Sequence, residues 1–95
     1  MHVLLREGFR GQRVVITMND RTVYDAIGVT TDPETSRAGA IAVRAPSAKA
    51  RVAVAVKPGN LLAAFDVDVS VHPHVAISLI GDGTVAFETS SRPFA

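Results

Sequence analysis

The stretch VAISLIGDGTVAFET, residues 75–89, contains the clearest secondary-structure signal in the chain. Val75 to Ile80 and Thr84 to Thr89 place apolar side chains at alternate positions, and this period of two is typical of β-strands. Between these segments, Gly81-Asp82-Gly83 has the composition of a tight turn. The stretch therefore predicts a β-hairpin.

The same period of two continues through most of the chain, interrupted by Gly, Pro and Asn residues. A first strand is expected before a turn at residues 8–11. Asn19-Asp20, which tolerates the positive φ of a hairpin turn, joins two more strands. Expected strands outside the opening hairpin also cover residues 13–19, 21–25, 40–44, 51–57 and 61–71.

Seven or eight short strands, spaced by roughly 8–12 residues, predict an all-β fold of the antiparallel β-sandwich type. In strand number and turn spacing the pattern resembles immunoglobulin and transthyretin-like architectures, although the Cys…Trp…Cys pattern of immunoglobulin domains is absent. At most one short helical turn is expected, near residues 33–38, with Asp32 as its N-cap and Pro33 at its first position. A length of 95 residues predicts one domain, residues 1–95.

Composition argues against several classes of partner. Ten basic and nine acidic residues leave a net charge of +1, without the positive surplus that binds a nucleic-acid backbone. No apolar run approaches the roughly 18 residues of a membrane span, and the first nine residues lack the apolar core of a secretory leader. We therefore expect no nucleic-acid or membrane partner. The expected location is cytoplasmic, or outside the cell if a leader has been removed.

The sequence gives little support to catalysis. Cysteine is absent, and no Ser lies in a Gly-x-Ser-x-Gly sequence, so the common signatures of a nucleophile are missing. The absence of Cys also excludes disulfides and thiolate metal sites. We expect a protein that is not an enzyme and that uses no cofactor.

The most informative feature for function is a strand that is apolar on both faces. In Val52 to Val56, valines alternate with Ala53 and Ala55, whereas a sandwich strand normally leaves one face polar. Either the small outward alanines are in contact with water, or a loop, another subunit or a fused partner domain covers them, most simply the second subunit of a homodimer. Val15, Ala53 and Ala55 are the candidate interface residues of an interaction or assembly module. Pairing through an edge strand is the other mode of association.

A second hypothesis comes from FDVDVSVHPHVAISL, residues 65–79, in which the polar residues share one register. Alternate residues of a strand lie on one face about 6.6–7 Å apart, so His72 and His74, with Asp68, could bind one divalent ion such as Zn²⁺. Pro73 favours a turn between the histidines, which would leave them as ordinary loop residues. A small-ligand or divalent-metal-binding sandwich is thus the alternative function.

Overall fold

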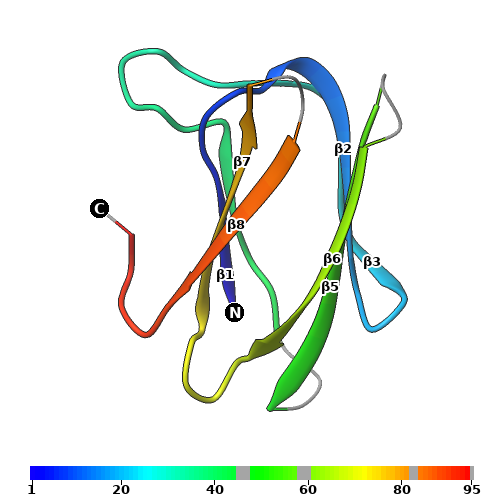
Figure 1. Ribbon diagram of the computed structural model, residues 1–95, viewed down its shortest axis with the longest axis vertical. Helices are drawn as coiled ribbons and strands as arrows, with labels where there is room; N and C mark the ends of the chain where they lie inside the picture. Colours follow the sequence, from blue (N-terminus) through cyan, green and yellow to red (C-terminus); the bar gives the residue numbers. More distant parts are fainter. Residues whose placement is uncertain (45–47, 58–60, 82–83, 95) are drawn as a thin grey trace.

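The computed structural model describes residues 1–44, 48–57, 61–81 and 84–94, and within these residues the protein has eight strands and no helix. Figure 1 shows the strands as two sheets that face each other. The prediction of an all-β fold is confirmed. The strands in chain order are β1 (His2–Leu5), β2 (Arg10–Met18), β3 (Arg21–Thr30), β4 (Gly39–Ala42), β5 (Lys49–Lys57), β6 (Leu61–Asp68), β7 (His74–Ile80) and β8 (Thr84–Ser90).

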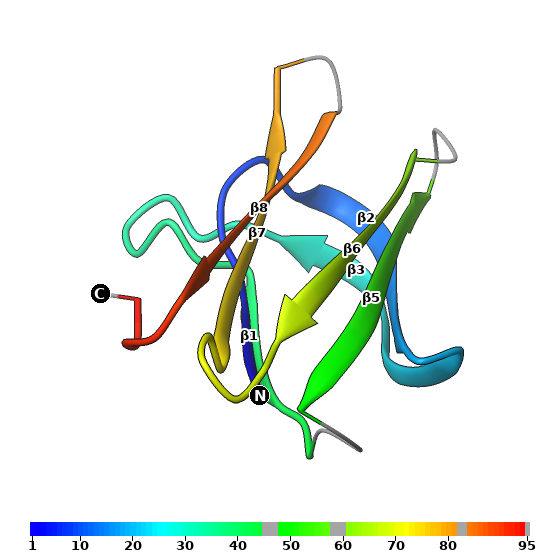
Figure 2. The ribbon, with the colours of Figure 1, turned by 60° about the horizontal axis from the view of Figure 1, so that its bottom comes forward.

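The two sheets have four strands each, in the orders β4-β1-β7-β8 and β3-β2-β5-β6. Five of the six strand pairs are antiparallel, but β1 and β7 are parallel. The prediction of antiparallel pairing therefore agrees with five pairs and is wrong for β1 with β7. A parallel pair needs a long connection, and here strands β2 to β6 provide it, as both Figure 1 and Figure 2 show.

The hairpins follow from local sequence. Asn19 and Asp20 have φ values of 50° and 66°, and Met18 pairs directly with Arg21. This is the two-residue turn with positive φ that the sequence predicted. Strands β7 and β8 form the predicted second hairpin, with Ile80 opposite Thr84, while Asp82 and Gly83 of its turn lie outside the described residues.

The sequence allowed at most one short helical turn, near residues 33–38, and the structure has none there. Asp32 accepts a hydrogen bond from the backbone N–H of Glu34 at its side chain (2.8 Å), as an N-cap would. However, the backbone N–H of Asp32 donates to the carbonyl of Arg37 (2.8 Å), and Ser36 has a left-handed φ of 57°. These contacts close a tight turn in place of a helical one. Local hydrogen bonds between side chain and backbone compete in this way with helix formation.

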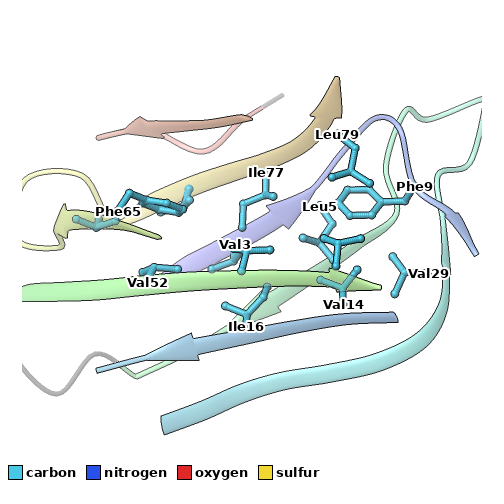
Figure 3. Packing of buried hydrophobic residues seen from close by; sticks show 14 residues of the cluster. Val3, Leu5, Phe9, Val14, Ile16, Val29, Val52, Phe65, Ile77 and Leu79 are labelled. Carbon is cyan, nitrogen blue, oxygen red and sulfur yellow. The ribbon is translucent and has the colours of Figure 1, made fainter. Parts of the chain in front are cut away.

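The core lies between the two sheets and comes from alternate residues of their strands. Figure 3 shows Ile16 and Val52 of one sheet facing Val3 and Ile77 of the other, and all four are at most 1% exposed. Phe9, in the connection between β1 and β2, packs into the same cluster. Among the described residues no polar or charged side chain is buried, so apolar packing holds the sheets together.

Candidate interaction surface

The outer side of the β3-β2-β5-β6 sheet carries a block of mostly apolar side chains, which we call the Ala/Val face. Strands β2, β5 and β6 pair in a continuous register, so residues of the same parity form rows across the sheet. The face consists of two neighbouring rows: Val15, Ala55 and Leu62 in one, and Thr17, Ala53 and Ala64 in the other.

The structure brings the three predicted interface residues together. Val15 is the direct cross-strand partner of Ala55, and Ala53 lies in the next row. All three are half-buried by their neighbours in the sheet, whereas the inward Val54 between the two alanines is fully buried. The valines of β5 thus belong to the core, and its alanines belong to the outer surface.

Two exposed residues of this region were missed by sequence reasoning. Leu62 belongs to the Ala/Val face and is 74% exposed, and Ile27, on the neighbouring edge strand β3, is 81% exposed. Leu62 could have been found, because Leu61 to Ala64 is apolar in both registers, like Val52 to Val56. Ile27 lies where the pairing of β2 with β3 shifts register, and a simple alternation does not reveal such an irregularity.

Ion pairs flank the Ala/Val face on two sides. Arg13 of β2 donates to both carboxylate oxygens of Asp25 on β3, at 3.0 and 2.8 Å. Arg51 of β5 lies 3.5 Å from Asp66 of β6. The hydrogen bond from Arg13 lowers the pKa of Asp25, so this carboxylate is ionised at neutral pH. Each of these arginines therefore has a negative partner, while the exposed Lys57, opposite Arg13 on β5, adds a positive charge beside the apolar centre.

The structure places Asp68 in a turn. Strand β6 ends at Asp68, short of the predicted end at residue 71, because the carbonyl of Asp68 accepts a hydrogen bond from the backbone N–H of His72 (2.7 Å). The Asp68 carboxylate accepts a hydrogen bond from the Ser70 hydroxyl (2.6 Å). That bond, with a smaller contribution from the charge of Lys49, lowers the pKa of Asp68. The carboxylate thus has a structural role in the turn.

His74, by contrast, is positioned next to a histidine from the other end of the chain. The parallel pairing of β1 with β7 places His2 opposite His74, and their rings stack with centroids 5.1 Å apart and an interplanar angle of 14°. Across the described ranges, no group of three or more His, Asp or Glu side chains could hold a metal ion. His72, His74 and Asp68 therefore do not form a three-ligand site there.

Comparison of the sequence and structure with protein-family models, curated proteins and solved structures finds no match. In the part of the chain that the structure describes, no helix is long and apolar enough to cross a membrane.

Proposed function

We propose that this protein is a non-enzymatic interaction module that associates with a second copy of itself through the Ala/Val face. The observation that supports the proposal most directly is a sheet whose central strands carry apolar side chains on both sides. The inner side supplies the core through Val52, Val54 and Val56, and the outer apolar residues do not belong to that core. Contiguous apolar surface of this kind is typical of protein contacts.

Charge and shape favour a second copy as the partner. The charges of the two arginine–aspartate pairs cancel, and Lys57 adds a single positive charge beside the face, so two copies can approach without strong mutual repulsion. Alanine side chains at the centre allow two sheets to approach at the ordinary spacing of about 10 Å. A two-fold arrangement needs only one self-complementary surface, and the Ala/Val face provides it.

Association through the face has more support than association through the β3 edge. The pairing of β3 with β2 shifts register at three places. Such irregularities twist an edge strand and discourage the addition of another strand.

We also propose that the architecture is an immunoglobulin- or transthyretin-like sandwich. This finer prediction rests on strand number and turn spacing alone.

The alternative function, a small-ligand or divalent-metal-binding sandwich using His72, His74 and Asp68, has less support. Asp68 is engaged by Ser70, and His74 stacks on His2. A metal ion held by His72 and His74 would have to find its remaining ligands elsewhere.

Sedimentation equilibrium tests self-association directly. The wild-type mass is expected to rise with concentration from 10.0 kDa toward the mass of a dimer. Ala55→Glu is expected to raise the dissociation constant at least about tenfold, because a charge at the centre of an interface loses its hydration. A wild type that stays monomeric at high micromolar concentration would contradict the proposal.

Ala86→Glu is the matched control for this experiment. Ala86 is also half-buried, but it lies on β8 of the other sheet, opposite Ser78. The Ala86→Glu substitution is therefore expected to leave the dissociation constant of the dimer unchanged. Equal weakening by the two substitutions would show that the added charge acts without regard to position, and would therefore count against the Ala/Val face as the contact surface.

A further inference from the structure

The outer side of the other sheet carries an open pocket of about 490 Å³. Strands β1 and β4, His74 at the start of β7, and Pro93 and Phe94 after β8 line it. Figures 1 and 2 show the segment after β8 turning away on the same side of the molecule as the loop between β3 and β4, and Arg37 of that loop completes the lining. The volume lies in the range of about 300–1,000 Å³ that is usual for small-molecule sites.

The ionisable residues that line this pocket are all basic, so they favour a negatively charged ligand. They are Arg37, His2 and His74, and no Asp or Glu contributes to the lining. The two ion pairs among the described residues lie on the other sheet, so Arg37 has no carboxylate partner in that part of the chain. A guanidinium presents a planar pair of N–H donors that matches a carboxylate.

The stacked histidines add donors in a fixed position. His2 and His74 are held in register by the β1–β7 pairing, and the backbone N–H of His2 also donates to the carbonyl of Pro73 (2.8 Å). Each imidazole has at least one N–H donor, and a protonated one has two. Because Arg37 would repel a divalent cation and no carboxylate lines the pocket, the chemistry fits an anion better than a metal ion.

The remaining lining residues provide an apolar wall. Leu4 of β1 and Ala40 of β4 pair directly, and both line the pocket with Phe94. Apolar walls with a few convergent polar groups are typical of sites that bind small organic molecules. We propose that this pocket binds a small organic carboxylate, whose charge contacts Arg37 and the two imidazoles and whose apolar body packs on Leu4, Ala40 and Phe94.

Calorimetric titration of the full chain with 3-phenylpropionate tests this inference, and 3-phenylpropanamide serves as the uncharged analogue. We expect saturable binding of the carboxylate with a dissociation constant below about 1 mM and at least about tenfold weaker binding of the amide. Side-chain NMR signals of His2 and His74 are expected to shift with the carboxylate.

Variants locate the site. Arg37→Gln is expected to weaken carboxylate binding at least about tenfold, since it removes the positively charged guanidinium and its pair of N–H donors. Arg21→Gln, an exposed arginine on β3 of the other sheet, is the matched control and should leave binding unchanged. Arg37 is exposed, and NMR spectra of the free variants will verify that they are folded.

Several results would overturn the inference. They are the absence of saturable carboxylate binding up to about 10 mM, equal binding of the amide, and equal effects of Arg37→Gln and Arg21→Gln. Zn²⁺ is titrated separately, and binding of Zn²⁺ without binding of the carboxylate would also contradict it. The pocket and the Ala/Val face lie on different sheets, so failure of one proposal does not affect the other.

Discussion

Gly8→Ala is expected to destabilise the protein by more than about 3 kcal/mol, which is a severe loss for one methyl group. An alanine Cβ at this position would collide with the backbone carbonyl oxygen of Leu79 and lie 2.8 Å from the Leu79 Cβ. The backbone has little freedom to move away, because the N–H of Leu79 donates to the carbonyl of Glu7 (2.8 Å). Gly8 also has a φ of +90°, which L-residues rarely adopt.

Gly11→Ala separates the two causes of this loss. Gly11 has a nearly equal φ of +85°, but an added Cβ there would meet nothing within 4 Å. Conformational strain alone should therefore cost about 1–3 kcal/mol. Urea unfolding of both variants measures the difference. Equal losses of stability in the two variants would mean that the close approach of Leu79 to Gly8 adds nothing to the cost of the Gly8→Ala substitution.

Ile16→Ala is the second substitution with a large expected effect, a loss of about 2–5 kcal/mol. Ile16 is 0% exposed and lies in β2 opposite Tyr24 on one side and Val54 on the other. Truncation would leave a cavity between the two sheets. Since a domain of this kind is stable by only about 5–15 kcal/mol, this single change should remove a large part of its stability.

Ile27→Ala is the matched control for Ile16→Ala. The residue type is the same and the strand is adjacent, but Ile27 is 81% exposed, so its loss should change the free energy of unfolding by no more than about 0.5 kcal/mol. Both variants are compared by urea unfolding at low protein concentration. Similar losses for the two would mean that Ile16 does not have the core position described above.

Much of the fold could be predicted because it depends on local sequence. The alternation of Val and Ala in β5 correctly indicated which side chains face the core, and Asn19-Asp20 correctly indicated a turn with positive φ. The same alternation identified Ala53 and Ala55 as outward residues. Side-chain parity within a strand is a property of the strand itself, so one sequence is enough to establish it.

Features that depend on distant segments could not be predicted. The parallel pairing of β1 with β7 brings His2 to His74, and nothing within either segment specifies the other as its neighbour. The pocket beside them also needs Arg37 and Phe94, which lie in other parts of the chain. The one helical turn that the sequence allowed does not form, and Ser36 there adopts a left-handed φ that the residue types did not indicate.

The most direct measurement of the central claim is a dilution series followed by backbone NMR. Signals of Val15, Ala53, Ala55 and their neighbours on β2, β5 and β6 are expected to shift with protein concentration, because these residues form the Ala/Val face. Signals on the outer side of the β4-β1-β7-β8 sheet should stay constant. Spectra that do not change with concentration, or changes confined to that other sheet, would contradict self-association through the Ala/Val face.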